Sequence, residues 1–192
     1  MKHYAKRLPG SVTLLGVASL LLLAACSSNK VIDSAVDENG VPNWVTQGSN
    51  IFKAKDGRLF HGVGSSPGLG DFSLQTGTAD LRARAEVARI LASYMEIVSR
   101  DFIASGEAEQ VGFTEQHVAE QMDNLAAVEL SGVRIIGHWQ DKERKVVYSI
   151  AEMDLQSARE ALKKEASLHE GLRAYISAEG NDIFDRLAKS VE

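Results

Sequence analysis

Cys26 is the residue whose type and setting most clearly suggest chemistry, because it is the single cysteine of the 192-residue chain. A lone thiol has no partner for an intramolecular disulfide and cannot build a multi-cysteine zinc site. Such a thiol either packs as a small apolar side chain in a core or carries an attached group. The residues before it favour attachment.

Residues 1–25 have the layout of a secretory signal peptide. Lys2, Lys6 and Arg7 come first without an acidic residue, and the apolar run Leu14–Leu23 follows. Ten helical residues span about 15 Å, half of a hydrocarbon core of roughly 30 Å. We therefore expect residues 1–25 to be removed rather than to remain as a transmembrane helix.

Leu23, Ala24, Ala25 and Cys26 resemble the bacterial lipobox, in which the cysteine after one large and two small residues receives lipid. An ordinary signal peptidase needs a small residue where Leu23 stands. The resemblance implies a diacylglyceryl thioether on Cys26, an acylated new amino terminus and a firm hold on membrane lipid. Ser27 replaces the Asp that favours inner-membrane retention, so the resemblance also implies export to the outer membrane.

The charge of the chain disfavours nucleic-acid binding. Lys and Arg total 21 against 26 Asp and Glu, and no stretch forms a basic patch that could neutralise a phosphate backbone. Removing residues 1–25 leaves 18 basic and 26 acidic residues, a formal charge of -8. An anionic lipid surface repels such a body on average, so the acyl chains are the evident membrane attachment and the domain is expected to stand off the bilayer.

The polar residues 26–41 are interpreted as the lipidated N-terminus and a tether that ends before Pro42. Asp37–Gly40 places carboxylates beside a glycine but lacks calcium-loop spacing, which favours a turn. Residues 42–155 are expected to form an α+β domain, and residues 156–192 a helical C-terminal extension. The composition, 44% hydrophobic and 24% charged, suits one globular core.

Two apolar segments, Trp44–Phe52 and Leu59–Val63, flank Asp56-Gly57 and predict a β-hairpin. The glycine-rich stretch 62–70 is interpreted as a turn from strand to helix. It lacks both the Rossmann fingerprint and the P-loop, because Pro67 stands where a third glycine is needed and the stretch contains no lysine followed by Ser or Thr.

Residues 72–105 carry the strongest helical pattern. Its predicted apolar stripe consists of Leu81, Ala85, Ala88, Ala92, Met95, Val98 or Ser99, and Phe102. Arg82, Arg84 and Arg89 could bind an anion, although charges on a solvated helix face are the ordinary case. The same apolar pattern could face a sheet or a partner chain.

Residues 113–128 predict a second helix that Thr114 could cap. Segments 133–139 and 146–153 predict a second hairpin. Strict alternation would put Val133, Ile135 and Trp139 on one face and Arg134, Ile136 and His138 on the other. A final helix is expected from Asp154 to about Ser177, with Gly180 interrupting it.

These elements together predict an α+β fold. An antiparallel sheet of three to four strands in two hairpins is covered by the long amphipathic helix, the second helix and the C-terminal helix.

Several short motifs in order resemble the Lpp-twenty family of small bacterial outer-membrane lipoproteins. They are Pro42-Asn43-Trp44, Gly62 to Ser66, Ala79 to Arg89, Trp139-Gln140-Asp141, Tyr148 and Asp154-Leu155. The resemblance implies a compact α+β domain and a non-enzymatic role at the outer membrane; some relatives form part of flagellar outer-membrane rings. It carries no catalytic residue across, and Gly62, Gly64, Ala79, Ala85 and Trp139 transfer as scaffold.

H-E-x-x-H, a motif typical of zinc enzymes, does not occur in the chain. The letters of G-x-S-x-G occur once, at Gly64–Gly68, and those of S-x-x-K once, at Ser27–Lys30. The histidines after Cys26 are scattered along the chain: His61, His117, His138 and His169. His61 and His138 could meet if the two hairpins pair, and could then hold a metal. Isolated histidines are more often structural. We therefore expect no catalytic, cofactor or metal site.

The preferred function is that of an envelope scaffold that assembles with itself or with other envelope proteins through the long helix and the sheet edges. One alternative is a component of the flagellar outer-membrane ring needed for motility, which rests on analogy with relatives. Another is a periplasmic module that binds an envelope ligand such as peptidoglycan through the sheet face or the 62–70 stretch.

Overall fold

The computed structural model describes residues 35–54, 57–126, 132–164 and 168–191. The chain divides into two units, Met1–Ile32 and Asp33–Glu192, and every described residue belongs to the second. Cys26, the lipobox and the expected signal peptide lie outside the described residues.

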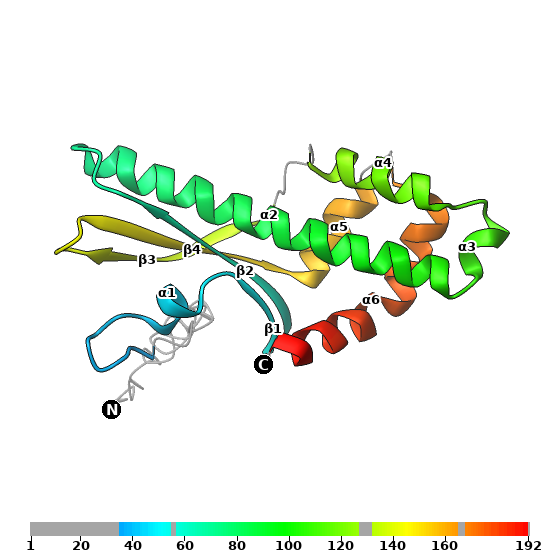
Figure 1. The fold of residues 1–192 in the computed structure, drawn as a ribbon, viewed down its shortest axis with the longest axis horizontal. Coiled ribbons are helices and arrows are strands. Elements are labelled where there is room, and N and C mark those ends of the chain that lie inside the picture. The colour runs from blue at the N-terminus through cyan, green and yellow to red at the C-terminus, as the bar shows by residue number, and fades with distance from the viewer. Residues whose placement is uncertain (1–34, 55–56, 127–131, 165–167, 192) are drawn as a thin grey trace, which may run out of the picture. The chain divides into compact units, whose positions relative to one another are not determined.

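Four antiparallel strands form one sheet in the order β1-β2-β4-β3 (Figure 1). β1 (Asn50–Ala54) pairs with β2 (Gly57–Ser66), and β3 (Arg134–Asp141) pairs with β4 (Val146–Asp154), so both predicted hairpins are confirmed. β2 and β4 join the hairpins at the centre of the sheet. The α+β prediction is therefore correct, with four strands.

α2 is the longest helix, and α3, α4 and α6 pack against it. The helical segments are α1 (Asn43–Gln47), α2 (Phe72–Ala104), α3 (Glu107–Gln110), α4 (Glu115–Ala126), α5 (Leu155–Lys164) and α6 (Glu170–Val191). The first half of α2 runs along one face of the sheet, and its second half extends past the strands to α4, α5 and α6 (Figure 1).

Two element boundaries differ from the predicted ones. Trp44 lies in the short helix α1 and not in a strand, because Pro42 starts a helical turn that ends at Gly48 with a positive φ of 74°. The C-terminal helix is predicted to break at Gly180, but α6 continues through Gly180. Its described part instead consists of two helices, of which α5 ends at Lys164 and α6 begins at Glu170.

Local chemistry fixes both ends of α2. Asp71 Oδ1 accepts hydrogen bonds from the backbone N–H groups of Ser73 (2.8 Å) and Leu74 (3.0 Å), which otherwise have no partner in the first turn. Gly106, with φ of 81°, follows the last turn and lets the chain leave in the left-handed conformation.

Gly62 and Gly64 lie inside β2 and do not form the predicted turn. A Cβ at either position would overlap the backbone of Ala83 on α2. The absence of these two side chains therefore lets α2 pack directly on the central strand. The turn itself is confined to the residues between Ser66 and Phe72.

The predicted apolar stripe of α2 is wrong over its first half. Leu81 is 70% exposed and Ala85 is also exposed. The buried side chains of this half stand two residues before or after the predicted ones, as Ala83 does between Leu81 and Ala85. The buried residues of α2 are Gln75, Ala79, Ala83, Val87, Leu91, Tyr94, Met95, Val98, Ser99 and Phe102. The two stripes merge from Met95 onward, where the helix leaves the sheet and is buried among other helices.

A bulge in β3 makes the predicted alternation of that strand wrong. Ile135 pairs with Ala151, but Gly137 pairs with Ile150, so Ile136 is an extra residue without an opposite partner. One inserted residue reverses the faces of everything after it. Ile135 and Trp139 therefore lie on opposite faces.

Aromatic side chains fill the core where the sheet, α2 and α6 meet. Phe60, Tyr94 and Phe184 form edge-to-face contacts with centroid distances of 5.2 to 6.0 Å. Tyr94 Oη donates a 2.7 Å hydrogen bond to the carbonyl of Gly180, and burial raises the pKa of Tyr94 to about 12. The phenol is therefore a neutral donor under ordinary conditions.

Candidate functional site

A polar cluster of Asp80, His138 and Ser149 connects α2 to the second hairpin. Ser149 Oγ donates a 2.7 Å hydrogen bond to Asp80 Oδ1, and His138 Nε2 lies 2.6 Å from the same oxygen. His138 and Ser149 are direct neighbours across β3 and β4, on the face of the sheet that α2 covers. Serine, histidine and aspartate are also the residues of a catalytic triad, so the order in which they contact one another decides whether the serine could act as a nucleophile.

The geometry of this cluster differs from that of a serine nucleophile with its base. In a working triad, histidine lies between the serine and the acid and takes the proton from the hydroxyl. Here Asp80 lies between the other two and accepts from Ser149 directly, so the hydroxyl proton already has a carboxylate partner. Ser149 is also fully buried. The cluster can fasten α2 to the sheet, but it cannot present an activated oxygen to a substrate.

A second polar group crosses the opposite face of the sheet. Glu152 of β4 lies between its two register partners, His61 of β2 and Arg134 of β3. Its Oε2 lies 2.9 Å from His61 Nε2, and its Oε1 accepts from Arg134 Nη2 at 3.0 Å. Glu152 is buried, and a buried carboxylate needs such partners to offset its lost hydration. Cross-strand contacts among these three polar side chains thus suit a structural role.

The histidines do not meet as the metal hypothesis required. His61 contacts Glu152 on one face of the sheet, and His138 contacts Asp80 on the other. Among the residues that the structure describes, no group of three or more His, Cys, Asp or Glu could hold a metal ion. Asp37, in the predicted turn, accepts backbone hydrogen bonds from Asn39 and Val41.

His117 and His169 do come together, at the other end of α2. Their ring centroids lie 6.1 Å apart, and both rings contact Phe113. His117 Nδ1 is already 2.8 Å from Thr114 Oγ1, and His169 Nδ1 accepts from the backbone of Gly171. Both histidines therefore close local turns.

The arginines of α2 do not converge on one point. Arg82 donates to the carbonyl of Ser65, Arg84 donates to the carbonyl of Val133, and Arg89 pairs with Glu86 at 3.0 Å. Their guanidinium groups thus bind different strands or neighbours on the helix. This arrangement supports the solvated-face interpretation over an anion site.

Exposed apolar side chains form the other notable feature of α2. We define the outer ridge as Leu81, Ala85, Ala88 and Ala92, which follow one another at four- and three-residue steps on one side of the helix. Leu81 and Ala85 are exposed, and Ala88 and Ala92 are half-buried. Burial in the domain's own core therefore does not explain Leu81 or Ala85.

Sequence reasoning missed the roles of Asp80, Ser149 and Glu152. A signal was present, because Ser149 and Glu152 interrupt the otherwise apolar strand from Val146 to Met153. Asp80 and Ser149 are 69 residues apart in the sequence, and His61 and Glu152 are 91 residues apart. Only the fold brings each pair together.

Among the described helices, none has the length and hydropathy that a membrane crossing requires. Comparison with known proteins returned no matching protein-family model, no matching curated protein and no matching solved structure.

Proposed function

We propose that this chain is a lipoprotein, anchored in the outer membrane through acyl chains on Cys26, that acts as a non-enzymatic scaffold of the cell envelope. The observation that carries the proposal is the order of basic residues, apolar run and Leu23-Ala24-Ala25-Cys26, followed by Ser27. The resemblance to the Lpp-twenty family points in the same direction.

The polar clusters support the non-enzymatic part of the proposal. Asp80 engages Ser149, and Glu152 engages His61 and Arg134, so these groups stabilise the packing of the sheet and of α2. A catalytic site needs a nucleophile and a base within reach of a substrate. The hydroxyl of Ser149 is neither accessible nor next to a free base.

The outer ridge of α2 supports the assembly part. Leu81 is 70% exposed, and the alanines around it let another backbone approach closely. The contact proposed here is with a second copy or with another envelope protein.

Light scattering of the soluble chain from residue 27 onward tests the assembly directly; the described core lies within the unit Asp33–Glu192. At micromolar concentration we expect a mass above that of the monomer, and we expect Leu81→Gln to reduce it without changing the melting temperature. Ile97→Gln is the matched control, because Ile97 is also an exposed apolar residue of α2 but lies off the outer ridge. A strictly monomeric wild-type species argues against self-assembly.

A further inference from the structure

His117 and His169 lie beside each other where α4 and α6 begin, and both rings accept hydrogen bonds from the backbone. His117 Nδ1 accepts from the N–H of Thr114 at 3.0 Å, and His169 Nδ1 accepts from the N–H of Gly171 at 3.2 Å. A backbone N–H group can only donate, so each Nδ1 must present its lone pair. Both rings are therefore neutral in this structure, with the proton on Nε2.

These two bonds cap the two helices. The carbonyl of Thr114 accepts from the N–H of Val118, so Thr114 is the N-cap of α4. His117 reaches back to Thr114 from the third helical position, where a capping box has Glu or Gln. The carbonyl of His169 accepts from the N–H of Arg173, so His169 is the N-cap of α6. Such bonds satisfy N–H groups that otherwise have no partner at the start of a helix.

The two capped ends are in contact with each other. We define the corner as Phe113, Thr114, His117, Gln121 and His169. The buried ring of Phe113 stacks on His117 at a centroid distance of 5.5 Å and contacts His169 edge-on at 5.2 Å. The two imidazole centroids lie 6.1 Å apart, and the backbone N–H of His169 donates to Oε1 of Gln121 on α4 at 3.0 Å. The corner thus joins the start of α6 to α4.

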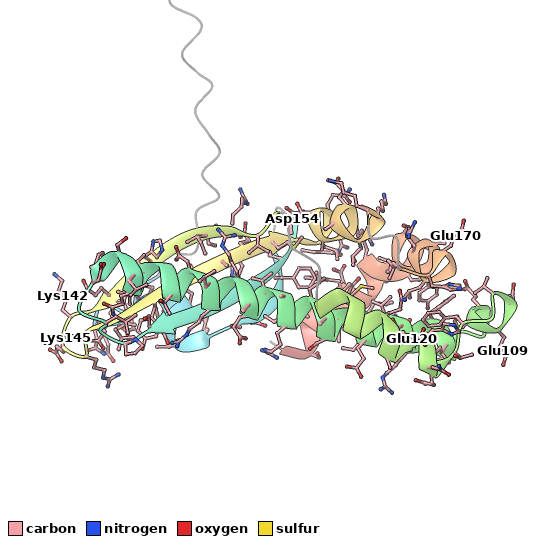
Figure 2. The ribbon with its side chains drawn as sticks, turned by 90° about the horizontal axis from the view of Figure 1, so that it is seen from above. Glu109, Glu120, Lys142, Lys145, Asp154 and Glu170 are labelled. Carbon is pink, nitrogen blue, oxygen red and sulfur yellow. The ribbon has the colours of Figure 1, made fainter. Side chains whose placement is uncertain are left out.

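Charged side chains surround the corner, and acidic ones are the more numerous. Figure 2 shows Glu109, Glu120 and Glu170 at this end of the domain. Glu120 is bound by Gln116, and Arg173 donates to a main-chain carbonyl. Acidic groups at a distance attract an imidazolium only weakly through water, and they cannot replace a lost cap. The described charged side chains of the adjoining helix segments are Arg100 and Asp101 of α2, Glu107 and Glu109 of α3, Glu115 and Glu120 of α4, Lys163 and Lys164 of α5, and Glu170, Arg173 and Glu179 of α6.

The two histidines of the sheet have partners of the opposite kind. His61 Nε2 lies 2.9 Å from a carboxylate oxygen of Glu152, and His138 Nε2 lies 2.6 Å from one of Asp80. A protonated ring still donates to a carboxylate, so gaining a proton does not remove these contacts. Within the part of the chain that the structure describes, neither ring of the corner forms an ion pair with a carboxylate. Protonation therefore breaks the contacts of the corner and keeps those of the sheet.

We propose that the corner is a pH-sensitive latch, in which neutral imidazoles hold the first turns of α4 and α6 together and mild acid releases them. Protonation places a hydrogen on Nδ1, which then faces a backbone N–H that cannot accept it. The hydroxyl of Thr114, 2.8 Å from Nδ1 of His117, can turn to accept, but the N–H groups of Thr114 and Gly171 lose their partners.

Repulsion acts in the same direction as the lost bonds. Two imidazolium rings would lie 6.1 Å apart, at the positive ends of two helix dipoles. An open corner binds more protons than a closed one, so closure weakens as the pH falls through the range in which histidine changes charge, about pH 5 to 8. The latch adds a regulatory device to the proposed scaffold and does not depend on lipid at Cys26.

Nitrogen-15 NMR of the full chain in uncharged detergent micelles tests the latch. Near pH 7.5 the imidazole shifts of His117 and His169 should show an unprotonated Nδ1 and a protonated Nε2. Amide hydrogen exchange of Val118 and Arg173 then reports the first turns of the two helices, because their N–H groups bond to the N-cap carbonyls. After correction for the intrinsic effect of pH on exchange, we expect their protection to fall about fivefold between about pH 7.5 and about pH 5, which corresponds to one hydrogen bond of about 1 kcal/mol.

Two substitutions keep an acceptor at each cap but remove the titrating ring. His117→Gln supplies a usual capping-box residue, and His169→Asn supplies a preferred N-cap. His117→Gln should hold the loss at Val118 below about twofold while Arg173 still loses protection, and His169→Asn should do the reverse. His138→Gln is the matched control, because it removes an exposed histidine whose partner is a carboxylate. Both amides should keep the wild-type fall in this variant.

The tautomers and the wild-type exchange need no variant, so the proposal stays testable whichever variants fold. A protonated Nδ1 on either ring near pH 7.5 would overturn it, because that cap could not form. Protection that stays constant down to about pH 5, or that falls equally in the wild type and in both cap variants, would overturn it as well.

Discussion

Ser149 Oγ donates a 2.7 Å hydrogen bond to Asp80 Oδ1 across the interface between β4 and α2. Because Ser149 is fully buried and its acceptor is a carboxylate, we expect Ser149→Ala to lower the free energy of unfolding by about 1 to 3 kcal/mol. Urea denaturation measures the loss. Ser93→Ala, at an exposed position of α2, should stay within about 0.5 kcal/mol of the wild type. Equal effects at the two positions would contradict the fastening role of Asp80.

A substitution at Gly64 tests whether the backbone of α2 packs directly on β2. Gly64→Ala places a methyl group into the backbone of Ala83, and we expect a loss of about 3 kcal/mol or more, or failure to fold.

The control is Gly77→Ala, in the interior of α2, where a Cβ meets nothing within 4 Å. Alanine favours a helix over glycine, so this variant should gain up to about 1 kcal/mol. Thermal melts of both variants give the comparison, and a neutral Gly64→Ala variant would refute the described contact.

The sequence pattern was sufficient for the order and type of the main elements, because hairpin turns and helical periodicity are local signals. It could not predict which side of α2 faces the sheet. The stripe through Leu81 and the one through Ala83 are both apolar, and Gly62 and Gly64 select the second by opening space on β2. It also could not supply the bulge at Ile136, which moves Trp139 to the other face. The polar cluster at Asp80 depends on both features and was therefore out of reach.

Stability should fall in alkaline solution through the two buried tyrosines. Burial raises the pKa of Tyr94 to about 12 and, with a hydrogen bond to Asp101, that of Tyr175 to about 12, against about 10 in an unfolded chain. Since the folded state holds these protons more tightly, the associated stability is full below pH 10 and is lost as the pH rises toward 12. Tyr94, which is fully enclosed, contributes on the order of 2 to 3 kcal/mol, and Tyr175, whose hydroxyl is only partly covered, contributes less.

The variant Tyr94→Phe separates this effect from general alkaline unfolding. It removes the titrating group along with the bond to Gly180, so it should be less stable at neutral pH and lose less between pH 10 and 12. Urea midpoints across this range measure both changes. A wild-type slope in the variant would count against Tyr94 as a source of the dependence.

Intact mass spectrometry of the native protein is the most direct measurement of the central claim. The account predicts a chain that begins at Cys26, with a diacylglyceryl group on its sulfur and an acyl group on its amino terminus. A native chain with an unmodified thiol at position 26, or one that still carries residues 1–25, would contradict it.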